Sequence, residues 1–134
     1  MVLKPDFSLG IQCFVDADFA GVWDKEDCSD LSSVYSCTGY VIMYTGCPIL
    51  WVSRLQTEVA LSTTEAEYIT LSQAMHDLIP FMNLVEDVSL ILNIDYTIPE
   101  VQYKNTKTTS NISADVYEDN SGALELAKVP KMRP

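Results

Sequence analysis

Three short apolar runs in the first half of the chain predict three β-strands. They are Leu9 to Asp16 (LGIQCFVD), Thr38 to Tyr44 (TGYVIMY) and Ile49 to Ser53 (ILWVS), and each is rich in β-branched or aromatic residues. Only the turn sequence Thr45-Gly46-Cys47-Pro48 separates the second run from the third, which predicts an antiparallel hairpin. The stretch from Ala20 to Tyr35 is polar and acidic and predicts a loop.

A helical repeat follows and predicts one long helix from about Thr64 to Leu92. Pro80 lies inside this segment. Because an interior proline costs about 3 kcal/mol, we expect a kinked helix with a break near Ile79. Apolar side chains recur at intervals of three and four residues and would share one face of the helix: Tyr68, Leu71, Met75, Leu78 and Met82.

The last third of the chain predicts one more strand and one more helix. Asp95 to Ser113 is polar and predicts a loop containing a weak strand, and Ala114 to Glu118 (ADVYE) predicts a short strand. Asn120 and Ser121 can cap a short helix from Gly122 to Val129. The order of elements predicts a single α/β domain over residues 1–134, with a mixed central sheet. Its first and fourth strands would pair in parallel, with the long helix as a right-handed crossover between them.

Length and hydropathy bound the class of protein. A chain of 134 residues that is 48% hydrophobic fits one globular domain. No apolar run approaches the ~18 residues that a membrane helix needs, and Lys4 and Asp6 lie where a secretory signal would be apolar. We therefore expect an intracellular protein, cytoplasmic or nuclear, with no membrane partner. The four cysteines form no CxxC pair, which gives a zinc site little support.

The net charge of −11 argues against a freestanding nucleic-acid binder, because phosphate binding normally rests on a positive surface. A cluster of carboxylates that holds cations would reverse the local charge, and a neighbouring domain could supply a basic surface. Alternatively, the acidity only keeps the domain soluble. Among the remaining side chains, Tyr40 and Trp51 are predicted to lie in the core, and His76 on the surface of the long helix.

Three acids lie at special places in the predicted fold. Asp16 ends the first strand, Glu67 lies in the first turn of the long helix, and Asp119 follows the fourth strand. If the first and fourth strands are parallel neighbours, Asp16 and Asp119 lie side by side at the carboxyl ends, where α/β sheets bind ligands. Clustered carboxylates repel one another without cations, and hard oxygen ligands suit Mg²⁺ or Mn²⁺. Two such ions ~3.5–4 Å apart can drive phosphodiester hydrolysis.

Spacing alone leaves simpler interpretations open. Glu67 could be a capping-box residue that satisfies the backbone N–H of Thr64, although Ser62 and Glu65 have the same spacing. Asp119 could only start a turn, and Asp16 could be an ordinary loop acid. Asp18 and Glu65 are the fallback candidates for the site.

Four sequence words occur in a fixed order and resemble the ribonuclease H domain of copia-type retrotransposon polyproteins. They are FVDADFAG (14–21), SCTGYVI (36–42), LWVSRLQTEVALSTTEAEYITLSQA (50–74) and YEDNSGALELAK (117–128). The likeness covers nearly the whole chain except the loops 20–33 and 95–113. ALSTTEAEYITLSQA is its most specific part.

The resemblance implies a ribonuclease H-like fold and a two-metal hydrolysis of the RNA strand of RNA–DNA hybrids during reverse transcription. It implies that Asp16, Glu67 and Asp119 are catalytic and hold Mg²⁺ or Mn²⁺, as one ion or two. It also implies two partners, an RNA–DNA hybrid and the reverse transcriptase domain of the same polyprotein. Four flanking residues could hydrogen-bond the sugar–phosphate backbone, including the 2′-OH, or could simply cap helices: Thr63, Thr64, Asn120 and Ser121.

Related ribonucleases H use a fourth acid, followed by a last strand and helix, and this sequence stops at Pro134 without them. We therefore expect the fifth strand and last helix to be missing, the fourth strand to be an exposed edge with weak self-association, and little or no hydrolysis by these residues alone. One alternative is a non-catalytic transposon remnant that serves as a folded interaction module. Another is an unrelated acidic binding protein, whose acids Mg²⁺ would not contact.

Overall fold

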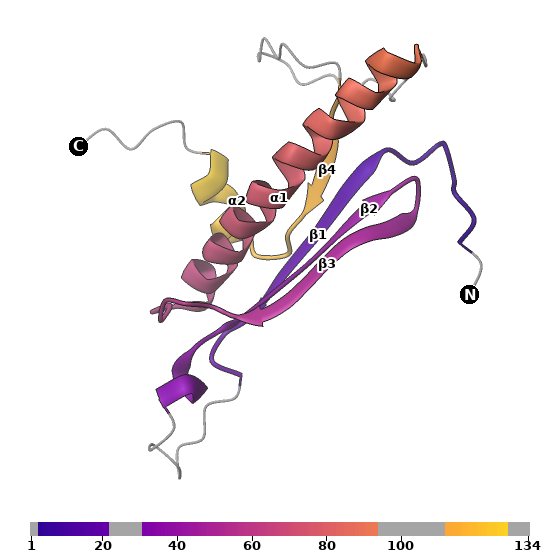
Figure 1. Cartoon of the computed structure of the whole chain (residues 1–134). Helices are drawn as coiled ribbons and strands as arrows, with labels where there is room; N and C mark the ends of the chain where they lie inside the picture. The colour runs from indigo at the N-terminus through magenta and orange to yellow at the C-terminus, as the bar shows by residue number, and fades with distance from the viewer. Residues whose placement is uncertain (1–2, 22–30, 94–111, 129–134) are drawn as a thin grey trace.

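The protein folds as a mixed sheet with a long helix across one face and a short helix packed against the long one (Figure 1). The structure, a computed structural model, describes residues 3–21, 31–93 and 112–128. The elements in chain order are β1 (Ile11–Asp18), a 3-10 helix (Leu31–Val34), β2 (Cys37–Tyr44), β3 (Cys47–Leu55), α1 (Thr63–Leu92), β4 (Ala114–Tyr117) and α2 (Ser121–Lys128).

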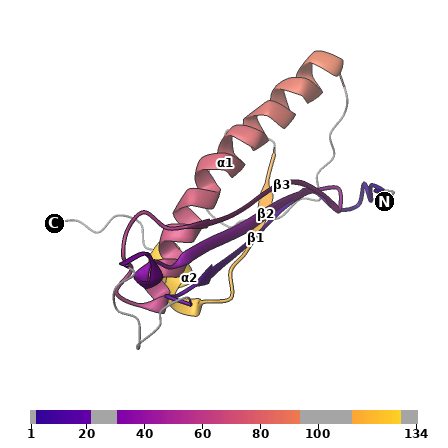
Figure 2. The same ribbon diagram turned by 60° about the horizontal axis from the view of Figure 1, so that its bottom comes forward.

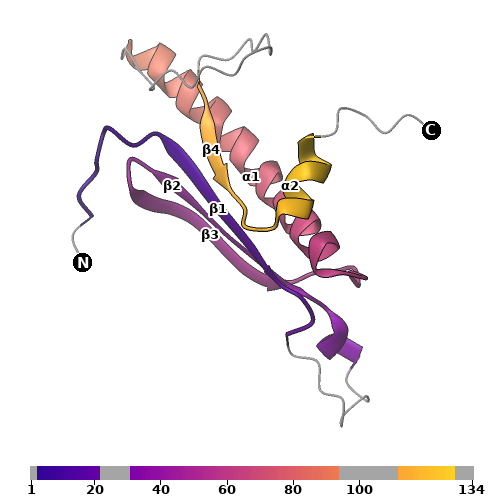
Figure 3. The same cartoon turned by 180° about the vertical axis from the view of Figure 1, so that it is seen from behind.

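The sheet has the order β3-β2-β1-β4 within the described ranges. β1 pairs antiparallel with β2, β2 pairs antiparallel with β3, and β4 pairs parallel with β1. Seen from behind, β4 lies beside β1 at one edge (Figure 3). The three antiparallel strands and the parallel pairing of the fourth strand with the first are therefore confirmed. The predicted loop 95–113 and the end of the predicted last helix at Val129 fall largely outside the described residues.

β1 is shifted by two residues from its predicted position and ends at Asp18. The expectation that Asp16 ends the strand is therefore wrong. β4 pairs only with Ile11 to Phe14 of β1, whereas the antiparallel pairing with β2 continues and places Asp16 opposite Gly39. Asp16 thus lies just beyond the parallel pairing but is still held by β2.

The hairpin between β2 and β3 turns on two residues, not four. Thr45 and Gly46 have φ of 50° and 75°, the left-handed pair that a type I′ turn requires. Cys47 and Pro48 already belong to β3. Pro48 is tolerated there because β3 is an edge strand and the register shifts beside it, between Ile42 and Met43.

The core lies between α1 and the sheet (Figure 2). The predicted stripe of α1 is confirmed except for one residue. Leu71 and Leu78 are buried, and Met75 and Met82 pack partly buried against the core, whereas Tyr68 is 44% exposed. Small and polar residues also take part in the buried face: Ala66, Glu67, Thr70 and Ala74. This face packs on the inward side chains of β1 and β2: Ile11, Cys13, Val15, Tyr40 and Ile42.

α1 has the predicted length, and it runs through Pro80 without interruption. The expected break near Ile79 is therefore wrong. A proline at position 80 leaves the carbonyl of His76 without its helical donor. Both residues are exposed, so that carbonyl can be solvated. His76 lies on the helix surface, as predicted.

The opposite face of the sheet exposes aromatic side chains. Trp51 is 70% exposed, so its predicted core position is wrong. Leu50 and Val52 pack against the core, and alternation along a strand then turns Trp51 to the other face. Phe14 and Tyr117 lie on the same open face and stack, with ring centroids 4.8 Å apart. No helix among the described residues is long and apolar enough to cross a membrane.

Candidate metal centre

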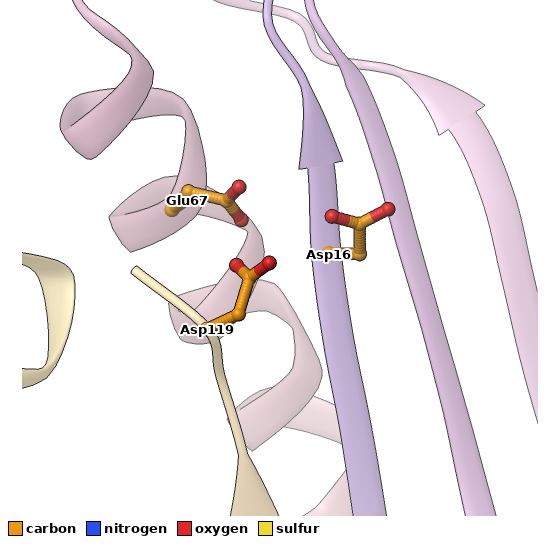
Figure 4. A group of neighbouring side chains, drawn as sticks. All are labelled: Asp16, Glu67 and Asp119. Atoms are coloured by element: carbon orange, nitrogen blue, oxygen red, sulfur yellow. The ribbon is translucent and has the colours of Figure 1, made fainter. Parts of the chain in front are cut away.

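Three carboxylates from three separate elements meet at one end of the sheet. Asp16 of β1, Glu67 of α1 and Asp119, which follows β4, each present an oxygen, and these oxygens lie within 4.8 Å of one another. Figure 4 shows the three side chains turned toward a common point. The structure thus brings together the three acids that the sequence singled out, although Asp16 and Asp119 are 103 positions apart in the chain.

The start of α1 explains why Glu67 is available for this meeting. Ser62 is the N-cap and accepts the Glu65 N–H at 3.1 Å, and Glu65 Oε2 accepts the Leu61 N–H at 2.8 Å. The capping box is therefore formed by Ser62 and Glu65. The interpretation of Glu67 as the capping-box partner of Thr64 is therefore wrong. The choice of Glu65 as a fallback member of the acidic group is also wrong, because Glu65 does not belong to that group.

A buried polar network holds the first turns of α1 against the sheet. Gln56, only 3% exposed, donates from Nε2 to the Ala66 carbonyl at 2.9 Å and to Thr70 Oγ1 at 3.0 Å. Thr70 Oγ1 also lies 3.1 Å from Thr38 Oγ1 of β2. Because Ala66 precedes Glu67, this network fixes the part of the helix that carries the carboxylate. The sequence analysis missed Gln56, since a lone glutamine between a strand and a helix carries no signal of burial.

Asp119 is positioned by the turn from β4 into α2. Asn120 caps α2, because its Oδ1 accepts the Ala123 N–H at 3.0 Å. Thr64 Oγ1 lies 3.5 Å from the same Oδ1. A Cβ at Gly122 would stand 3.1 Å from Thr64 side-chain atoms, so a larger residue there would require Thr64 or α2 to shift by a few tenths of an ångström. Asp119 itself is exposed, as is Asp16.

The other residues singled out from the sequence lie around this group. Thr63 and Ser121 are exposed first residues of α1 and α2, and Thr64 and Asn120 are partly buried in the contact just described. The capping alternative is correct for Asn120. Asp18 is exposed and does not belong to the group of three.

A fourth acid, Glu118, was missed by the sequence analysis. It is 9% exposed, and its Oε1 accepts the Asn120 N–H at 3.0 Å. Its position beside Asp119 was the only available signal, and adjacency in a strand normally points two side chains to opposite faces.

Burial dominates the electrostatics of the site. Glu67 is only 7% exposed, and burial raises the pKa of its carboxyl to about 7. The negative charges of Glu118, Asp16 and Asp119 also raise this pKa, whereas a hydrogen bond from the Ala17 N–H lowers it. Burial also raises the pKa of Glu118. The hydrogen bond from the Asn120 N–H lowers this pKa, and the charges of Asp119 and Asp16 raise it. No lysine or arginine of the described ranges forms an ion pair with these acids; the ion pair found is Lys128 with Glu125 on α2.

This donor set fits a hard divalent cation. All the donors are carboxylate oxygens, which Mg²⁺ and Mn²⁺ prefer. Glu67 Oε2 is buried and has no hydrogen-bond partner among the described residues. A buried charged oxygen without a donor is costly, and a cation at the meeting point of the three acids would remove that cost.

Comparison with curated proteins finds polyproteins of plant transposons. The chain is 36% identical over 80 residues to a retrovirus-related Pol polyprotein from transposon TNT 1-94 of Nicotiana tabacum, which covers 58% of this chain. It is 30% identical over 128 residues, 96% of this chain, to the Pol polyproteins from transposons RE1 and RE2 of Arabidopsis thaliana. The chain spans only 6–7% of the length of these polyproteins.

A further similarity involves a different kind of protein. The chain is 39% identical over 64 residues to secreted RxLR effector protein 161 of Plasmopara viticola, covering 48% of this chain and 39% of that protein. No family model matches the chain, and no solved structure matches it.

Proposed function

We propose that this chain is the ribonuclease H domain of a retrotransposon Pol polyprotein, which hydrolyses the RNA strand of RNA–DNA hybrids with Mg²⁺ or Mn²⁺. The homologues are retrovirus-related Pol polyproteins of transposons, which supports a retrotransposon-derived function in general. The single observation that carries the finer proposal is the meeting of Asp16, Glu67 and Asp119 at the end of the sheet. The topology, with its parallel β4 and covering α1, is compatible with a ribonuclease H-like fold.

Each acid has a distinct part in this mechanism. When bound, a divalent cation supplies Lewis-acid activation of water and neutralises the charge on the leaving oxygen. Asp16 and Asp119 are exposed, so a phosphodiester can reach their carboxylates from solvent. Glu67 is buried and anchors the group from α1, with one carboxylate oxygen oriented by the N–H of Ala17. The three acids thus hold the cations and orient the reacting phosphate.

Recognition of the hybrid would use the hydroxyl groups at the rim of the site. Thr63 and Ser121 are exposed at the starts of α1 and α2, on the two elements that flank Glu67 and Asp119. Hydroxyl groups there can bond the sugar–phosphate backbone and the 2′-OH. Because the chain carries a net charge of −11, the reverse transcriptase domain of the same polyprotein would supply most of the positive surface for the hybrid.

The test is a cleavage assay on a labelled RNA–DNA hybrid with Mg²⁺ and with Mn²⁺. We expect slow cleavage that is confined to the RNA strand, stopped by EDTA and absent from Asp119→Asn. Single-stranded RNA and the DNA strand should stay intact. A chain that binds neither ion at millimolar concentration and cuts nothing would contradict the proposal.

A non-catalytic interaction module is the second candidate function. Two observations favour it: the open sheet face exposes Phe14, Trp51 and Tyr117, and part of the sequence is similar to a secreted RxLR effector protein. Large exposed apolar side chains in one area are typical of interaction sites. This candidate predicts that the chain cleaves no hybrid and that neither Mg²⁺ nor Mn²⁺ raises its melting temperature.

A further inference from the structure

We propose that Glu118 is a fourth carboxylate of the metal centre and serves a second divalent ion beside Glu67. This inference rests on the proposed function, because it requires that the centre binds Mg²⁺ or Mn²⁺. It adds a ligand to the group of Asp16, Glu67 and Asp119, and it places that ligand on the helix side of the sheet.

The state of the Glu118 carboxylate is the first argument. The side chain is 9% exposed, and one oxygen, Oε1, accepts the Asn120 N–H at 3.0 Å. The other oxygen, Oε2, is buried and has no hydrogen-bond partner in the described part of the chain. Buried polar atoms are nearly always satisfied, and an exception calls for a specific explanation such as a bound ion.

The direction of β4 is the second argument. Ala114 and Val116 pack against the core beneath α1, whereas Tyr117 stacks on the open face. Continuing this alternation, Glu118 turns toward α1, the element that carries Glu67. The carboxylates of Glu118 and Glu67 are close enough for their negative charges to repel each other.

The spacing of the oxygens explains why a second ion is needed. Glu118 lies outside the group whose oxygens are all within 4.8 Å of one another, so it does not share one ion with all three other acids. Glu67 Oε2 and Glu118 Oε2 are both buried and both without a donor among the described residues. Glu67 and Glu118 would together hold the second ion, and two ions in one centre would activate water and stabilise the leaving oxygen.

The variant Glu118→Gln separates the charge of this side chain from its structural role. The substitution removes the negative charge, while the amide oxygen of glutamine can still accept the hydrogen bond from the Asn120 N–H. We expect calorimetric titration to show two Mn²⁺ ions in the wild-type chain, and the second to bind about tenfold or more weakly in Glu118→Gln. Without metal, Glu118→Gln should melt at a higher temperature, because one of two repelling buried acids is gone. The matched control is Asp115→Asn on the same strand, which should change neither result.

The possible outcomes separate this inference from the proposed function. A wild-type chain that binds no divalent ion contradicts both. A wild-type chain that binds one ion, or a Glu118→Gln variant that binds two as tightly as wild type, overturns the role of Glu118 alone. If Glu118→Gln does not fold, the wild-type chain decides the matter through carbon-13 spectra. The second equivalent of diamagnetic Mg²⁺ should shift the side-chain carboxyl signal of Glu118, and a signal that does not shift overturns the inference.

Discussion

The two halves of α1 differ in what they bury. The first half, from Thr63 to Leu78, buries small and polar residues along with Leu71 and Leu78, and it carries Glu67 into the metal centre. The second half is richer in large apolar side chains, yet it exposes most of them: Ile79, Leu84, Val88, Leu90, Ile91 and Leu92. Hydrophobicity alone therefore does not locate the core of this protein. The polar contacts of the first half fix the helix where the site requires it.

The largest expected effect compares one leucine from each half. Leu78 is 2% exposed and Leu84 is 58% exposed. Leu78→Ala leaves a cavity between α1 and the sheet and should lower the free energy of unfolding by about 3 kcal/mol. Leu84→Ala should change it by less than about 0.5 kcal/mol. Urea unfolding of both variants measures the difference, and equal losses would show that the second half is packed as firmly as the first.

The next effect tests whether the polar network is what fixes the first half. Gln56→Leu removes the amide that bonds the Ala66 carbonyl and Thr70 Oγ1. We expect a loss of about 2 kcal/mol, because two buried hydrogen bonds disappear at about 1 kcal/mol each, although the Ala66 carbonyl keeps Thr70 Oγ1 as a donor. We also expect weaker Mn²⁺ binding through a displaced Glu67. The control is Gln73→Leu, because the Gln73 side chain accepts a 3.4 Å hydrogen bond from Arg54 at an exposed position. Unchanged Mn²⁺ affinity in a folded Gln56→Leu variant would show that the network does not position Glu67.

Much of the fold followed from sequence pattern, and the reasons for the exceptions are physical. Strand and helix order could be predicted because short apolar runs rich in β-branched and aromatic residues give way to apolar residues at intervals of three and four. Trp51 and Tyr68 were misplaced because a side chain's face depends on the neighbouring element, which no local pattern contains. The break at Pro80 was overestimated because a solvated carbonyl reduces the effect of the missing N–H.

The candidate site divides in the same way. Asp16, Glu67 and Asp119 could be singled out because each lies at a predicted strand end or helix start, and the structure places them together. Gln56 and Glu118 could not, because their importance comes from burial between segments distant in sequence. Which of Glu65 and Glu67 closes the capping box was also undecidable, since both pairs have the same spacing and only the observed N-cap, Ser62, chooses between them.

A smaller effect concerns the charge that the first half of α1 buries. The folded-state pKa of Glu67, about 7, lies above its ordinary value of 4.5. Its contribution to stability is therefore fully present below about pH 4.5 and is lost as the pH rises through about 7. Glu67→Gln should raise the metal-free free energy of unfolding at pH 8 by about 1 kcal/mol, change little at pH 4, and abolish stabilisation by Mg²⁺.

Urea unfolding in EDTA at the two pH values, repeated with Mg²⁺ at pH 8, makes this measurement. Glu58→Gln is a suitable control, because Glu58 is an exposed acid in the segment before α1. Mn²⁺ should also bind more tightly at pH 8 than at pH 6, since the ion competes with the proton on Glu67. If Glu67→Gln and Glu58→Gln have the same pH dependence, the buried charge is not what destabilises the metal-free site.

The smallest expected effect lies at the far end of α1. Asn93 closes the helix with φ of 49° and donates its N–H to the Leu90 carbonyl. Glycine adopts this left-handed conformation without strain, so Asn93→Gly should strengthen the cap by a few tenths of a kcal/mol and Asn93→Ala should weaken it by a similar amount. Because the last turns contribute little to the core, amide hydrogen exchange of residues 84–92 should respond more than the melting temperature does. A shift in melting temperature as large as that of Leu78→Ala would mean that the two halves of α1 unfold together with the core. The two halves would then differ in their amino-acid composition but not in their stability.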